Sequence, residues 1–162
     1  MVTLEELKTK NFTASNLTEK ASFHVTSAEM KRFESNVNLA TMVYKKITDY
    51  ANAHNIKPKY TGLEELCQIS ETSFKKSCAG SQKITRTFLY KLAVGLKMNI
   101  DEANKFFFLC GGALREDNLE DYICIKAIKD KDDILHFIEQ FNEFTIKMDK
   151  HQSVNRLKRL DE

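Results

Sequence analysis

The chain contains very few residues that interrupt helices, and this scarcity most constrains its fold. Its 162 residues include five glycines and a single proline, Pro58. Because glycine and proline mark turns and end regular elements, their scarcity favours helices joined by short connections. Hydrophobic residues make up 42% of the chain, which is enough for one packed core. The sequence therefore predicts an all-α fold.

Apolar residues recur at intervals of three and four, as they do on one face of a helix. The clearest stripe consists of Leu39, Met42, Val43, Ile47, Tyr50 and Ala51. The helices predicted by such stripes cover residues 39–56, 63–68, 71–79, 86–98, 99–110, 117–130 and 132–144. Residues with N-cap chemistry precede several of them, namely Thr61, Ser70, Thr85 and Asn99.

The pattern divides the chain into three parts. Residues 1–35 are polar and weakly patterned, and they predict an N-terminal extension that is partly helical, with Thr3 and Ser27 as caps. Residues 36–147 carry the apolar stripes and form the main domain. Residues 148–162 predict a polar, basic tail.

Cysteine and histidine are too scattered to indicate a disulfide framework or a metal site. No C-x-x-C pair occurs among Cys67, Cys78, Cys110 and Cys124, and each lies on an apolar stripe. We interpret them as reduced thiols of the core, which suits a cytoplasmic protein. Zinc needs clustered ligands, so we expect no metal and no other cofactor.

Several function classes find no support in the sequence. No stretch approaches eighteen consecutive apolar residues, and the first ten residues lack the apolar centre of a signal peptide, so we expect no membrane partner. No catalytic triad spacing, phosphate-binding loop or dinucleotide glycine pattern appears. We therefore expect a cytoplasmic protein that is not an enzyme.

Charge is distributed unevenly along the chain. Residues 60–100 carry six basic and three acidic side chains, whereas residues 101–143 carry five basic and eleven acidic ones. Only part of such a surface can face nucleic acid favourably.

The stretch "ISETSFKKSCAGSQK", residues 69–83, has the features of a short recognition helix. Ser70 is suited to cap it, Phe74 and Cys78 form its apolar side, and Gly80 stands at its end. With the run up to Met98, it resembles the lambda-repressor-like (XRE-class) helix-turn-helix domain. Residues 37–144 are similar to an extended bacterial form of that domain with two additional C-terminal helices.

This resemblance implies a compact bundle of about five helices that binds double-stranded DNA, as a transcriptional regulator does. It implies that bases are contacted by Thr72, Ser73 and Lys76. It implies that phosphates are contacted by Lys75, Lys83 and Arg86. A homodimer, in which a second copy adds specificity, stays open.

Three residues depart from the family pattern. Gln68 stands in the tight turn where the family usually has glycine, and a positive φ there is costlier for glutamine. Glu64 stands where the family usually has a small alanine. Glu71 opens the recognition helix, where a phosphate would otherwise bind, and Glu64 and Glu65 add negative charge on the neighbouring helix.

The alternative hypothesis is a protein-protein interaction module. It would use the acidic C-terminal helices and Phe106, Phe107 and Phe108, of which a helix can bury two on one face. An inhibitor or adaptor of phage or mobile-element type would fit this second interpretation.

Overall fold

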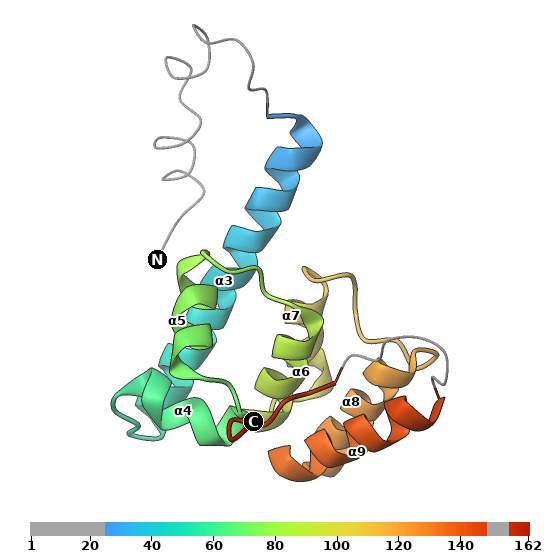
Figure 1. Ribbon diagram of the computed structural model, residues 1–162. Helices are drawn as coiled ribbons and strands as arrows, with labels where there is room; N and C mark the ends of the chain where they lie inside the picture. Colours follow the sequence, from blue (N-terminus) through green and yellow to red (C-terminus); the bar gives the residue numbers. More distant parts are fainter. Residues whose placement is uncertain (1–24, 149–155) are drawn as a thin grey trace, which may run out of the picture.

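The computed structural model describes residues 25–148 and 156–162, and within them the chain forms helices and no strand (Figure 1). The all-α prediction is therefore confirmed. The helices are α3 (Ser27–Ala53), α4 (Lys59–Cys67), α5 (Glu71–Ala79), α6 (Arg86–Gly95), α7 (Ile100–Phe107), α8 (Leu119–Asp130) and α9 (Ile134–Met148). The start of the predicted N-terminal extension, including the Thr3 cap, lies outside the described residues.

Helix α3 is longer than the sequence pattern indicated. A short helix capped by Ser27 and a separate helix from residue 39 were expected, but one continuous helix covers both. Its cap is Thr26, whose hydroxyl accepts a hydrogen bond from the Glu29 amide at 3.1 Å. The linking residues lack an apolar stripe, yet they contain no glycine or proline and include strong helix formers, so the helix continues through them.

Helix α4 begins earlier than predicted. Lys59 is its first residue and Pro58 is its N-cap, whereas a cap at Thr61 was expected. Proline fits here because amides at a helix start lack an intrahelical acceptor, so the missing N–H costs nothing. The Thr61 hydroxyl donates instead to a carboxylate oxygen of Glu71 at 3.2 Å.

The other three predicted caps are confirmed. The side chains of Ser70, Thr85 and Asn99 each accept a hydrogen bond from the backbone amide three residues later. These caps fix where α5, α6 and α7 begin, and therefore which side chains each helix turns outward.

Helix α6 is the centre of the bundle and packs against α4, α7, α8 and α9. Leu89, Tyr90 and Leu92 on this helix are almost completely buried. A Cβ at Gly95 would lie 2.7 Å from both the Cys67 sulfur and the Leu66 carbonyl oxygen. Only glycine permits this close approach, which fixes α4, and with it the following turn, against the core.

The last described residues return to the bundle. Leu157 is 1% exposed, and its backbone amide and carbonyl both bond the side chain of Asn142 on α9. The Lys158 carbonyl accepts from the Lys91 ammonium, and the Leu160 amide donates to the side chain of Gln68 at 3.0 Å. In Figure 1 this red segment passes close to the junction of α4 and α5. Residues 156–162 thus form part of the packed domain, while the rest of the predicted tail, 149–155, lies outside the described residues.

Candidate nucleic-acid interface

Helix α5 presents a polar outer face beside a buried inner face. Phe74 and Cys78 are 0% and 2% exposed, as the apolar stripe predicted. Thr72, Lys75 and Lys76 are exposed. The helix ends at Gly80, which has a φ of 79° and accepts the left-handed conformation without a steric penalty. Local sequence signals therefore determine which side of α5 a partner can touch.

The turn between α4 and α5 has the backbone conformation that the resemblance implies. Gln68 has φ 56° and ψ 40°, so a non-glycine residue occupies the left-handed region. Its side chain donates to the Glu65 carbonyl at 2.9 Å and accepts from the Leu160 amide. A glycine could not form these two hydrogen bonds, which connect the turn to α4 and to the C-terminal segment.

Carboxylates occupy the start of α5. A carboxylate oxygen of Glu64 accepts a hydrogen bond from the backbone amide of Glu71 at 3.0 Å. The Glu71 carboxylate forms an ion pair with Lys75 at 2.6 Å. The hydrogen bond from Lys75, followed by that from Thr61, lowers the pKa of the Glu71 carboxyl below its ordinary value. A phosphate at this end would meet two negative charges and an amide already bonded, so contacts are favoured further along the helix.

Ser73 is less accessible than predicted. It is half-buried, and its hydroxyl accepts a hydrogen bond from the Ser70 hydroxyl at 3.1 Å.

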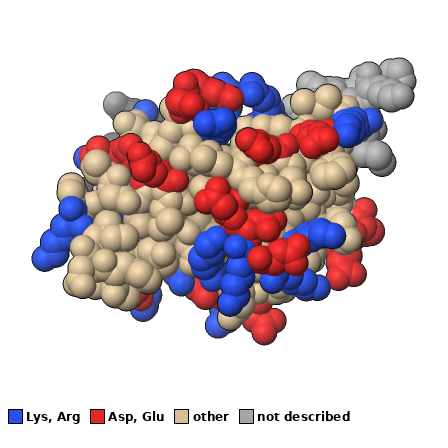
Figure 2. Space-filling view, turned by 90° about the horizontal axis from the view of Figure 1, so that it is seen from below, with Lys and Arg blue, Asp and Glu red and all other residues tan. Residues whose placement is uncertain are grey.

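Figure 2 shows the underside of the molecule, where acidic and basic side chains are interspersed. A surface of mixed sign attracts a phosphate backbone poorly, so this face is a poor candidate for DNA.

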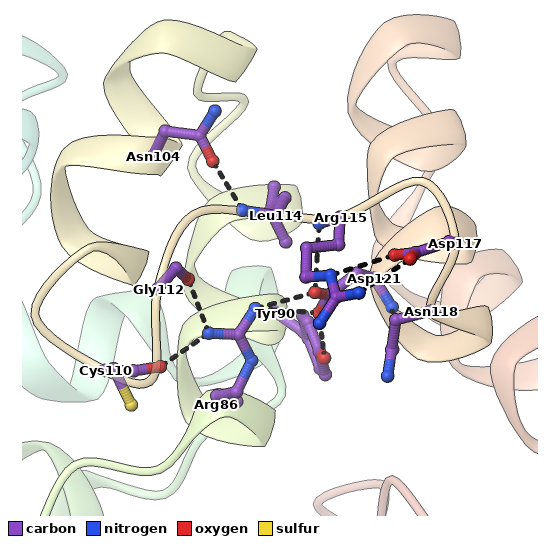
Figure 3. A network of polar contacts seen from close by, with 10 residues as sticks. All are labelled: Arg86, Tyr90, Asn104, Cys110, Gly112, Leu114, Arg115, Asp117, Asn118 and Asp121. Atoms are coloured by element: carbon purple, nitrogen blue, oxygen red, sulfur yellow. Dashed lines mark hydrogen bonds and ion pairs between the residues drawn. The ribbon is translucent and has the colours of Figure 1, made fainter.

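Arg86 does not face outward as a phosphate ligand would. One guanidinium nitrogen donates to the carbonyls of Cys110 and Gly112, and the other bonds both oxygens of Asp121 at 2.9 and 2.8 Å (Figure 3). The Arg86 side chain is 26% exposed and that of Asp121 4%. The donors of Arg86 are therefore used within the fold, and the phosphate contact assigned to it stays a prediction that this geometry does not favour.

The carboxylate of Asp121 joins two further groups at this point. It accepts hydrogen bonds from the Tyr90 hydroxyl and from the Arg115 backbone amide, while the Asn118 side chain caps the helix that carries it. Burial, followed by the hydrogen bond to Asp121, raises the pKa of Tyr90 above its ordinary value. The network links α6, the α7–α8 loop and the start of α8, so its role is structural.

Lys83, by contrast, is exposed and makes no hydrogen bond or ion pair with any described residue. Lys31 and Arg32 of α3 line the same hollow as Lys83 and are equally exposed. Sequence reasoning missed these two, because they belong to the region assigned to an extension. Two adjacent basic residues in the sequence could have indicated a binding surface, but only the fold shows that α3 brings them close to Lys83.

The three consecutive phenylalanines divide as predicted. Phe106 and Phe107 are 6% and 0% exposed, whereas Phe108 is 73% exposed. Of the set assigned to the alternative hypothesis, only Phe108 can contact a partner without rearrangement of the core.

The four cysteines are free thiols, and Cys67, Cys78 and Cys124 are buried. Burial raises the pKa of all four thiols above the ordinary value, to about 11 for Cys78.

Within residues 25–148 and 156–162 no group of three or more His, Cys, Asp or Glu could hold a metal ion. None of the helices described there is long and apolar enough to cross a membrane.

Comparison of the chain with protein-family models, with curated proteins and with solved structures finds no match in any of the three.

Proposed function

We propose that the protein binds double-stranded DNA with the outer face of α5, as a regulator of the lambda-repressor-like class would. One observation carries the proposal: a short helix, set at a tight turn with a left-handed residue, exposes hydroxyl and ammonium groups beside a buried apolar side. Thr72 and Lys76 would meet base edges, while Lys75 and Lys83 would hold phosphates. Ser73 would contribute only at its partly exposed edge.

The geometry predicts a weak and mainly electrostatic complex. Arg86 is withdrawn from the predicted contacts, and Glu71 partly neutralises Lys75. Two lysines, Lys75 and Lys83, then remain for the phosphates. With about 0.9 counterions released per contact, two contacts predict an affinity that falls roughly 12-fold between 50 and 200 mM salt.

Fluorescence anisotropy with labelled random duplex DNA tests the proposal across that salt range. The double variant Lys75→Ala/Lys76→Ala should bind more weakly, and its logarithmic salt slope should be shallower by about 1, because it removes one of the two phosphate contacts. The matched control is Lys126→Ala/Lys129→Ala, two exposed lysines of α8 that should leave binding unchanged. No binding by the natural protein at 50 mM salt, or equal effects of both variants, would refute DNA binding through α5.

A protein-binding module is the second candidate, and the 73% exposure of Phe108 favours it. When a partner covers an exposed aromatic ring, apolar surface is removed from water, and this favours the complex. If a partner is captured, Phe108→Ser should abolish the complex while leaving the helical circular dichroism signal unchanged. A complex that survives this substitution would exclude Phe108 as the contact.

A further inference from the structure

A groove of about 870 Å³ lies beside the candidate DNA-binding face. Its walls are the first half of α3, residues 83–86 before and at the start of α6, and residues 109–111 after α7. In Figure 1 the first turns of α3 project beyond the other helices, so this wall is one side of a helix. The volume falls in the range of ligand-binding sites, which span about 300–1,000 Å³.

Among the residues that the structure describes, the groove carries positive charge without an acidic partner. Lys31, Arg32 and Lys83 line it, all three are exposed, and none of their side chains forms a hydrogen bond or ion pair with a described residue. No described aspartate or glutamate is among the lining residues. Arg86 also lines it, but its guanidinium is held by Asp121 and two carbonyls. An occupant with carboxylates would therefore find three available cations.

The floor of the groove is apolar. Leu39 and Ile84 belong to the buried core, and Leu109 is half-buried against it. On α3, the residues Lys31, Ser35 and Leu39 that line the groove follow one another at intervals of four, so one helix face forms the wall. The charged groups stand toward the projecting end of this face and the leucine toward the core.

The walls are held in place before any ligand arrives. Arg86 bonds the carbonyls of Cys110 and Gly112, which fixes the loop after α7 against the start of α6. The Cys110 thiol also lies 3.5 Å from the Ile84 carbonyl, to which it donates. Because the site needs little ordering on binding, less of the interaction energy is lost to entropy.

We propose that this groove binds an acidic amphipathic segment of a protein partner. Its apolar side chains would cover Leu109, and its carboxylates would pair with Lys31, Arg32 and Lys83. The wall from Lys31 to Leu39 spans about 12 Å, which matches about two turns of a bound helix. A phosphate backbone fits less well, because it has no apolar side chain to cover the apolar floor.

A displayed library of random 12-residue peptides tests the proposal. Selection on the full chain, with counter-selection on the variant Lys31→Glu/Arg32→Glu, should enrich peptides that combine acidic and large apolar residues. A synthetic copy of the most enriched peptide should bind the variant at least about tenfold more weakly, since like charges would then meet at the rim. The control Lys126→Glu/Lys129→Glu on α8 should bind that peptide as the natural chain does.

The apolar floor is tested separately with Leu109→Gln, which should weaken the binding of the same peptide. Circular dichroism and urea unfolding check that this variant is folded. Enrichment of peptides without acidic residues, or an absence of peptides that distinguish the natural chain from the Lys31→Glu/Arg32→Glu variant, would overturn the proposal. If that variant loses duplex DNA and keeps the peptide, the groove is a nucleic-acid surface instead. These outcomes do not depend on whether α5 binds DNA.

Discussion

Replacing Arg86 with alanine should destabilise the fold and leave the salt dependence of DNA binding unchanged. The substitution removes four hydrogen bonds: two to the Asp121 carboxylate and one each to the carbonyls of Cys110 and Gly112. If Arg86 instead held a phosphate, the salt slope would become shallower and stability would hardly change.

The size of the effect follows from what the substitution leaves behind. Asp121 would remain as a carboxylate whose side chain is 4% exposed and without its cation. Breaking a buried ion pair in this way costs about 3–5 kcal/mol. Because the Arg86 side chain is itself 26% exposed, and the Tyr90 hydroxyl still donates to Asp121, the lower end of that range applies. We therefore expect a loss of about 3 kcal/mol, a large part of the 5–15 kcal/mol typical of a domain.

Urea unfolding followed by circular dichroism measures this loss. With a slope of about 2 kcal/mol per molar urea, the midpoint should fall by about 1.5 M. Arg115 is the matched control, because among the described residues its guanidinium pairs with Asp117 alone and both side chains are mostly exposed. Arg115→Ala should cost less than about 1 kcal/mol.

A double-mutant cycle with Asp121→Asn isolates the pair, and the coupling energy should be about 2 kcal/mol. A stability loss for Arg86→Ala no larger than that for Arg115→Ala, or a coupling energy near zero, would refute the structural role of this ion pair. A shallower salt slope with unchanged stability would restore the phosphate role that the sequence indicated.

Three further substitutions or conditions test other parts of the structure. Gln68→Gly should relieve the left-handed backbone by about 1 kcal/mol but lose two hydrogen bonds of about 1 kcal/mol each, so the urea midpoint should fall by about 0.5 M while amide exchange at Leu160 accelerates. Unchanged exchange at Leu160 would show that Gln68 does not hold the C-terminal segment. The free energy of unfolding should fall between pH 9 and 11, because the Cys78 thiol has its pKa raised to about 11 and keeps its proton in the folded state after the unfolded chain has lost it. Equal urea midpoints at pH 7.5 and pH 10 would contradict this. Phe107→Ala should cost about 3–5 kcal/mol because the ring is fully buried, whereas Phe108→Ala should cost less than about 0.5 kcal/mol. Similar thermal shifts for the two variants would contradict the division of the phenylalanines.

Local signals were sufficient for the helix that carries the candidate site. Ser70 caps α5, Phe74 turns inward, and Gly80 ends the helix in the left-handed conformation, all as the sequence predicted. The positive φ of Gln68 was also expected from its place in the turn. Each of these features depends on atoms within a few residues of one another, so the order of residues along the chain contains the necessary information.

Local signals misled where a residue's partner is distant in sequence. An arginine at the start of a helix, after an exposed lysine, has the same local pattern whether it faces a phosphate or a buried carboxylate. Only the packing of α8 against α6 brings Asp121 to Arg86, across 35 positions of the chain. The same holds for Leu160, which reaches Gln68 across 92 positions.

The sequence by itself thus determined the helical content, most of the caps and which side of each helix is apolar, because these depend on short-range hydrogen bonds and on periodicity. The tertiary structure alone decided which charges are available to a partner. It paired Arg86 internally, placed Glu64 at the start of α5 and brought Lys31 and Arg32 to Lys83. Charge neutralisation acts through space over a few ångströms, and the residues that become neighbours at that distance are set by how the helices pack.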